Sequence, residues 1–197
     1  MRHMLMLLMV PFTLFALQIN ESLLQVHATL FPKTILMDYQ FEKKLHEGAI
    51  TIAILYEEGD YRYAVKLQEM VEAKYRQGVK NIPVRVLLSS YDRLQKKAPA
   101  ATAYYLFPAS DSSIKAAVAL ANNHSSLSFV YDENDLMMGA MISVKITDKV
   151  KPYINVDALK DEGISLRPIL LNISELFFQP HSAVLENTFD QYSLYNV

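Results

Sequence analysis

Cysteine and tryptophan are absent from this sequence, and only five of its 197 residues are glycine. Without cysteine the chain can form no disulfide, and it has neither a thiolate nucleophile nor the cysteine that a lipoprotein anchor needs. The scarce glycines form none of the loops whose backbone N–H groups approach a phosphate, which disfavours nucleotide binding. The formal net charge of -2 provides no basic surface for nucleic acid.

Sequence motifs of catalysis are missing as well, since there is no G-x-S-x-G and no H-E-x-x-H. Ser125 and Ser126 beside His124 suggest a nucleophile and base, but neighbours on a turn rarely point together and no orienting carboxylate is evident. The histidines form no i, i+4 pair for a metal, and we expect surface or cap positions for His27, His46, His124 and His181. We therefore expect no enzyme activity, no cofactor and no metal.

The first residues have the layout of a signal peptide. Arg2 and His3 precede an apolar run over residues 4–17, and polar residues follow from Gln18. The run is shorter than the roughly 20 apolar residues of a transmembrane helix, although an uncleaved anchor is the alternative. A cysteine-free exported protein fits a bacterial periplasm better than a eukaryotic secretory compartment. We predict a signal peptide over residues 1–18, one domain over 19–179 and a C-terminal extension over 180–197, with a periplasmic mature protein that does not insert into the membrane.

The mature chain alternates between helix and strand patterns. A helix is predicted over residues 22–37, with Pro32 as a kink or break. Four β-branched and apolar runs then predict buried strands, and the helical patterns between them predict right-handed crossovers. We expect the strands at residues 49–56, 84–88, 103–107 and 127–131, and the helices at 61–77, 90–97 and 110–122. Such alternation is typical of an α/β fold with a mainly parallel sheet flanked by helices.

The segment that follows predicts a hairpin and two helices. Two alternating runs, residues 141–147 and 152–156, flank a polar turn at residues 148–149, which predicts an antiparallel pair at one side of the sheet. A short helix starting at Asp157 is expected to end at Gly163. Ser165 with Pro168 then predicts the start of a helix over residues 168–178.

Polar side chains gather in the loops that follow the four predicted strands. These loops should meet along one edge of the sheet, where open parallel sheets bind ligands. The candidate ligand-binding or partner-binding residues are Glu57, Glu58, Asp60, Tyr61, Ser90, Ser110, Asp111 and Asp132. Their carboxylates suit a hard cation or a cationic solute, although turn and N-cap roles account for each residue singly.

The C-terminal part of the domain carries a recognisable combination of short motifs: a Gly-x-Met-Ile segment, a strand closing in Ile-Asn, a helix ending at glycine and an Ile-Ser helix entry. The residues that carry it are Gly139, Met141, Ile142, Ile154, Asn155, Gly163, Ile164, Ser165, Ile169, Leu170 and Leu171. With the order of segments before it, this combination resembles the YfiR-like family over nearly the whole mature chain. These are scaffold residues, so the resemblance indicates a fold more than a function.

The resemblance implies a single-lobed, three-layer α/β sandwich similar to half of a periplasmic binding protein. It also implies a non-enzymatic repressor that binds the periplasmic region of an inner-membrane sensor or diguanylate cyclase, restrains cyclic-di-GMP synthesis and biofilm formation, and forms a homodimer. Relatives carry disulfides, so the lack of cysteine removes any redox-sensing role here, and Ala140 replaces a second glycine. The alternatives are a small-molecule-binding component of a transporter or sensor kinase, and an enzyme of unknown type.

Overall fold

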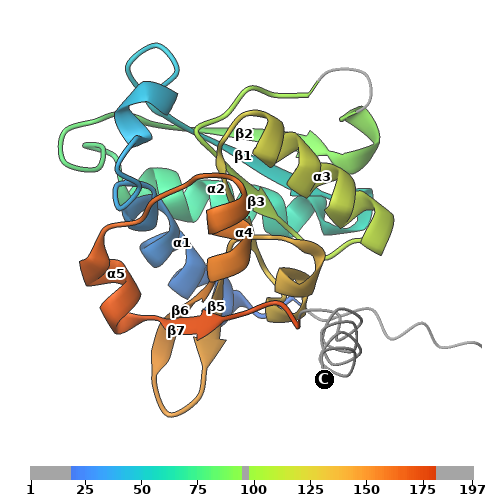
Figure 1. Cartoon of the computed structure of the whole chain (residues 1–197). Coiled ribbons are helices and arrows are strands. Elements are labelled where there is room, and N and C mark those ends of the chain that lie inside the picture. The colour runs from blue at the N-terminus through green and yellow to red at the C-terminus, as the bar shows by residue number, and fades with distance from the viewer. Residues whose placement is uncertain (1–18, 95–97, 181–197) are drawn as a thin grey trace, which may run out of the picture.

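The fold is built on one seven-stranded sheet with the strand order β2-β1-β3-β4-β5-β6-β7 (Figure 1). The computed structural model describes residues 19–94 and 98–180, so the predicted signal peptide and nearly all of the C-terminal extension lie outside the described residues. The strands are β1 (Ile50–Tyr56), β2 (Val84–Ser90), β3 (Ala103–Leu106), β4 (Leu127–Val130), β5 (Ile142–Ile146), β6 (Val150–Asn155) and β7 (Glu175–Phe177).

Helices cover both faces of this sheet, which gives the three layers that the sequence predicts (Figure 1). Helices α1 (Glu21–Ile35) and α2 (Tyr61–Lys74) pack on one face, and α3 (Asp111–Asn123) packs on the other. The C-terminal part adds α4 (Val156–Asp161) and α5 (Pro168–Ile173), and the short helical turns are η1 (Phe41–Lys44), η2 (Glu58–Asp60), η3 (Tyr91–Arg93) and η4 (Glu133–Met138).

Strand β1 lies inside the parallel part of the sheet, next to the edge strand β2. All seven of its residues are buried, as expected for an apolar, β-branched strand with helices over both faces. It pairs in parallel with β2 on one side and β3 on the other, and β3 continues in parallel to β4. The four strands predicted for this part therefore exist and run in one direction, which confirms the predicted α/β architecture.

The predicted hairpin is also present. Strand β5 joins β4 in parallel through the pair Phe129 and Ile142, and β6 pairs with β5 in antiparallel register. The tip of the β5–β6 hairpin projects from the body of the domain (Figure 1). At the base of the hairpin Asn155 is fully buried and begins α4, with its side-chain oxygen accepting from the Ala158 N–H at 3.0 Å. The same amide donates to the carbonyls of Leu136 and Ala140, at 2.9 and 3.1 Å.

The predicted helix over residues 168–178 is wrong. Helix α5 has only six residues, and the chain then extends into β7, which pairs in parallel with β6. The apolar run of this segment fits either structure, and the free edge of β6 decides in favour of a strand. Ser165 is not the helix cap: Arg167 is the residue before α5, Pro168 is its first, and the Ser165 carbonyl accepts from the Tyr39 N–H at 3.0 Å.

Three further predictions concern how individual helices continue or end. Pro32 lies buried inside α1 and does not end it. The predicted polar helix at 90–97 is only the turn η3, with residues 95–97 outside the described part. Gly163 does follow the end of α4 in the left-handed conformation, at φ 63°, which is the helix-ending role predicted for it.

The remaining motif residues hold the start of the hairpin. Gly139 ends η4 with φ 92°, a left-handed conformation that glycine adopts without strain. Met141 and Ile142 are buried in the core under α1, and Leu170 of α5 joins the same core. These four residues therefore have structural roles: Gly139 forms a turn, and the three apolar side chains fill the core.

Candidate functional site

The carboxyl ends of β1 and β2 and the start of α3 enclose a polar recess of about 300 Å³, here called the rim recess. It lies where the parallel strands end, which is the usual ligand position in open α/β sheets. Its lining consists of Tyr56, Glu57, Glu58, Gly59, Ser90, Tyr91, Asp92 and Ser113. A second recess of about 250 Å³ adjoins it and shares Tyr91, Asp92 and Ser113.

Hydrogen bonds tie the loops of this rim together. The Ser110 N–H donates to Glu57 Oε1 at 3.4 Å, so the loop after β3 is joined to the loop after β1. The Ser110 hydroxyl oxygen accepts from the Ser113 N–H at 3.3 Å and caps α3. Beneath them the Tyr91 hydroxyl donates to the Phe107 carbonyl at 2.7 Å, which fixes the buried ring as the floor.

The rim is mainly acidic, although the positive charges of Arg62 and Arg93 act on Asp60 and Tyr56. Burial raises the pKa of Asp135 to about 6, and the negative charges of Asp132 and Asp111 act in the same direction. The pKa of Asp60 is raised by burial and by Glu57. Burial raises the pKa of the Tyr91 phenol well above its usual value, and nearby carboxylates add to the rise. A positive charge placed here would therefore be stabilised, and an anion would be repelled.

The structure brings together only part of the predicted site. Glu57, Glu58 and Ser90 line the rim recess, and Ser110 is bonded to its wall. Asp132 instead lines a separate open recess of about 410 Å³ beside the hairpin. The other three predicted residues, Asp60, Tyr61 and Asp111, are not among those that line either recess; Tyr61 packs on Tyr56, with ring centroids 5.6 Å apart.

The capping roles predicted as the simpler explanation hold for some of these residues. Ser110 caps α3, and the carboxylate of Asp132 accepts from the Asn134 N–H at 3.0 Å at the start of η4. Asp60 precedes α2 but makes no capping hydrogen bond with its side chain. Its carboxylate thus has no structural role at the helix start.

Sequence reasoning missed five residues that line the recess: Tyr56, Gly59, Tyr91, Asp92 and Ser113. Tyr91, Asp92 and Ser113 line the recess, but they belong to η3 and α3, where a regular-structure pattern gives no hint of a site. Asp135, in the turn after β4, is only 8% exposed. The signal that was available is the run of acidic residues after β4, which marks a crowded carboxylate cluster.

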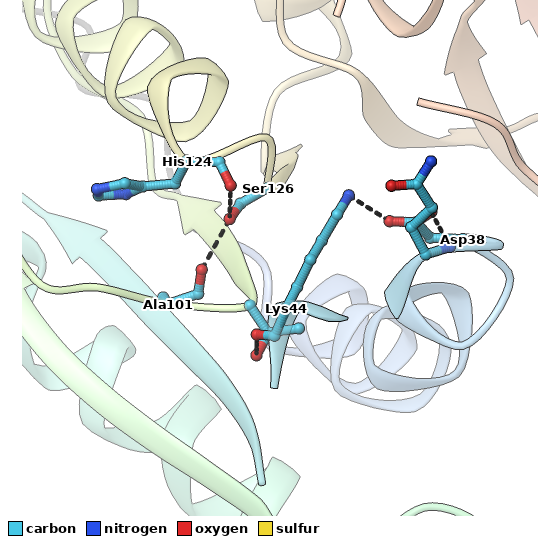
Figure 2. Close-up of polar contacts among 7 residues, drawn as sticks. Asp38, Lys44, Ala101, His124 and Ser126 are labelled. Carbon is cyan, nitrogen blue, oxygen red and sulfur yellow. Dashed lines mark hydrogen bonds and ion pairs between the residues drawn. The ribbon is translucent and has the colours of Figure 1, made fainter. Parts of the chain in front are cut away.

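The suspected pair of His124 and Ser126 is not a catalytic dyad (Figure 2). The Ser126 hydroxyl donates to the Ala101 carbonyl at 2.8 Å and to the backbone oxygen of His124 at 3.3 Å. The imidazole points away from it, and its Nδ1 lies 2.6 Å from the Tyr104 hydroxyl. The serine is therefore a buried connector at the amino ends of β3 and β4.

The same edge of the sheet contains a buried ion pair (Figure 2). The Lys44 ammonium donates to Asp38 Oδ2 at 2.5 Å, and the other carboxylate oxygen accepts from the Gln40 N–H at 2.8 Å. The Lys44 side chain is 12% exposed and that of Asp38 2%, so the loss of either partner would leave the other charge buried and unpaired. This pair fixes the turn after α1 and is structural.

His27 does not occupy the surface or cap position that the sequence predicts. It lies in α1 with 3% of its area exposed, between the rings of Tyr105 and Tyr131. Its Nδ1 is 2.6 Å from the Tyr105 hydroxyl, whereas its buried Nε2 has no hydrogen-bond partner. Burial lowers the pKa of His27 to about 4, so the ring is neutral at physiological pH.

An apolar groove of about 250 Å³ lies between α1 and α5, on the side of the domain that bears the hairpin. It is lined by Leu30, Lys33, Thr34, Met37, Pro152, Ile169, Leu170 and Ile173. Ile169 and Ile173 are 67% and 58% exposed, which is unusual for large apolar side chains that lie side by side on one helix. This surface is a second place where another molecule can bind.

Comparison with known proteins supports the fold. No protein-family model matches the sequence, and a comparison with curated proteins finds no significant match. A conserved domain protein from Vibrio cholerae superposes with a TM-score of 0.53 at 15% identity, over 79% of this chain and 60% of that one. CD0873 from Clostridium difficile, a substrate binding protein with adhesive properties in its ligand-free, open form, superposes with a TM-score of 0.50 at 11% identity, over 72% of this chain and 58% of that one.

The fold resembles a domain of a substrate-binding protein. This chain spans about 60% of the length of the solved structures it matches. The similarity agrees with the single lobe expected from the YfiR-like resemblance, while no sequence-level family match accompanies it.

Neither a metal site nor a membrane span is found in the described part of the chain. Residues 19–94 and 98–180 contain no group of three or more histidine or acidic side chains arranged to hold a metal ion. No helix among those residues has the length and apolar character needed to cross a bilayer.

Proposed function

We propose that this chain is a non-enzymatic, periplasmic binding protein that recognises a small, positively charged solute at the rim recess, as a component of a transporter or a sensor kinase. The observation that carries the proposal is the recess itself, a polar hollow walled by Glu57, Glu58 and Asp92 at the carboxyl edge of a parallel sheet. Fold similarity to a substrate binding protein supports it.

The geometry agrees with binding rather than with chemistry. Ser90 and Ser113 offer neutral hydrogen-bonding groups beside the carboxylates, and Tyr56 and Tyr91 provide aromatic walls. A cationic amine fits this combination, because a carboxylate pairs with the ammonium and an aromatic face attracts it. No histidine lines the recess to act as a general base.

Thermal unfolding in the presence of polyamines and basic amino acids tests the proposal. A solute that binds only the native state at about 100 times its Kd adds about 2.7 kcal/mol of stability, which raises Tm by roughly 5–10 °C for a chain of this size. The double variant Glu57→Gln, Asp92→Asn should lose the shift, whereas Glu72→Gln, an exposed control on α2, should keep it. A shift that the double variant retains, or none with any of these cations, refutes the rim as a cation site.

The apolar groove favours a second function, that of a regulator acting by direct contact. An exposed isoleucine pair beside a groove is typical of a surface that a protein partner covers. By the YfiR-like resemblance the partner is the periplasmic region of an inner-membrane sensor or diguanylate cyclase, with control of cyclic-di-GMP and biofilm formation as the outcome, and the regulator is a homodimer.

Replacement of Ile173 tests this second function separately. The variant Ile173→Asp should abolish recovery of the membrane partner from envelope extracts and raise cellular cyclic-di-GMP, while Met137→Asp, an equally exposed apolar residue outside the groove, should change neither. Equal behaviour of the two variants contradicts the regulatory function. Sedimentation of the purified protein reports on the homodimer independently.

A further inference from the structure

A small chamber lies under α1, separate from the rim recess. It has a volume of about 10 Å³, close to the space of a single water molecule. Its walls are almost wholly apolar, with Phe31, Phe129 and Ile142 among them, and His27 and Tyr105 bring nitrogen and oxygen atoms to it. A polar atom in such surroundings needs a partner, because burial removes it from water.

His27 supplies the atom without a partner. The fully buried Tyr105 hydroxyl lies 2.6 Å from His27 Nδ1 and has no other hydrogen-bond partner among the described residues, so donation to Nδ1 is the arrangement that pairs its proton. The neutral imidazole then carries its own proton on Nε2, which is buried and makes no hydrogen bond. In this tautomer His27, which lines the chamber, carries one unpaired N–H donor, suited to an oxygen acceptor.

The apolar groove between α1 and α5 adjoins this chamber. Leu30, Thr34 and Pro152 line both, so they form the partition between the two. The groove is some 25 times larger than the chamber, at about 250 against 10 Å³, and Ile169 and Ile173 stand at its outer side. An apolar body in the groove therefore lies against the partition that separates it from the chamber, of which Leu30 is one part.

We propose that the groove and the chamber together form a binding site for a small amphiphile, an alkyl or aryl body with an uncharged oxygen at one end. The body occupies the groove, and its carbonyl or hydroxyl oxygen accepts from His27 Nε2. A cationic head is excluded, because Nε2 is a donor and no carboxylate lines the chamber. The site is independent of the proposed rim recess, but it uses the groove of the second proposed function, so an amphiphile bound there would compete with a protein partner.

Octanol is the probe for this site. Titration of wild-type protein with octanol should raise Tm in a saturable way and shift the Nε2 resonance of His27 in spectra of nitrogen-labelled histidine. Octyltrimethylammonium, with the same chain and a charged head, should do neither. An unchanged His27 resonance at saturating octanol overturns the proposal, whatever happens to Tm.

Two variants separate this site from general surface binding. Leu30→Trp fills the groove and should weaken octanol binding at least tenfold, whereas Met137→Trp, outside the groove, should leave it unchanged. His27→Phe keeps an apolar ring but removes the donor, and should abolish the preference for octanol over an apolar molecule of the same length. Equal affinity in wild type and Leu30→Trp overturns the proposal, and the wild-type resonance decides the matter if either variant fails to fold.

Discussion

Acidification should destabilise this protein through His27. The pKa of the buried imidazole is about 4, against 6.5 for the free side chain. The unfolded chain therefore takes up the proton first as the pH falls, and the contribution of His27 to stability is full above pH 6.5 and lost progressively down to pH 4.

The magnitude follows from the same two values. Each pKa unit corresponds to about 1.4 kcal/mol, so the full loss is about 3 kcal/mol, and about 2 kcal/mol of it has occurred by pH 5. The geometry agrees with this, since the rings of Tyr105 and Tyr131 pack against the imidazole and neither can pair with a positive charge as a carboxylate would.

Urea unfolding at pH 7 and pH 5 measures the effect, provided that the contributions of other titrating groups are subtracted by comparison with a variant. Asp135 acts in the opposite direction, because its pKa of about 6 lies above its usual 3.8 and its protonation stabilises the fold as the pH falls. The comparison is therefore with the double variant His27→Phe, Tyr105→Phe, which removes the imidazole and the hydroxyl that would lose its partner. Between pH 7 and pH 5 the wild type should lose about 2 kcal/mol more than the double variant. Equal losses in the two proteins refute the reasoning.

Three further predictions concern buried polar groups. Asp135→Asn should stabilise the protein at pH 8 and have a smaller effect at pH 4.5, because only the charged carboxylate is penalised by burial; equal effects in urea melts at the two pH values count against this. Asp38→Asn should lower the free energy of unfolding by about 3 kcal/mol in a urea melt, because it leaves the Lys44 ammonium buried without its partner. Asp38→Leu combined with Lys44→Met should recover part of this loss, and a loss under about 1 kcal/mol for Asp38→Asn contradicts a buried ion pair. Asn155→Ala should lower the free energy of unfolding by about 2–4 kcal/mol in a urea melt, because three hydrogen bonds are lost inside the core. The exposed control Asn134→Ala should lower it by under about 1 kcal/mol, and similar values for the two variants contradict the Asn155 network.

The parallel half of the fold could be predicted from sequence because its signals are local. The run at residues 50–56 is β-branched, aromatic or apolar at every position, as expected for a strand covered on both faces, and Ser110 marks the start of α3 by its capping chemistry. Chain order and the preference for right-handed crossovers then restrict how such strands can be arranged.

The errors arose where distant partners decide the outcome. The chain after α5 becomes β7 because β6 offers an unpaired edge, and nothing within residues 168–178 reports that edge. His27 looks like any histidine on a helix, yet the tyrosine that pairs with it lies 78 residues away. Similarly, Glu57 and Ser110 are joined across 53 residues, so the sequence could name them but could not show that they share a wall.

Strand β2, at one end of the sheet, has a consequence for handling the protein. Among the described residues it pairs with no strand other than β1, so its outer side is a free edge, where the Val86 carbonyl accepts from the Gln68 side chain and Leu87 adds an exposed apolar side chain. Such an edge is a template for the addition of another strand, and charged side chains are the usual deterrent. Here Arg85, paired with Glu47 at 2.5 Å, provides that charge. Neutralising Arg85 would therefore be expected to show itself as aggregation during expression or concentration, long before any change in melting temperature.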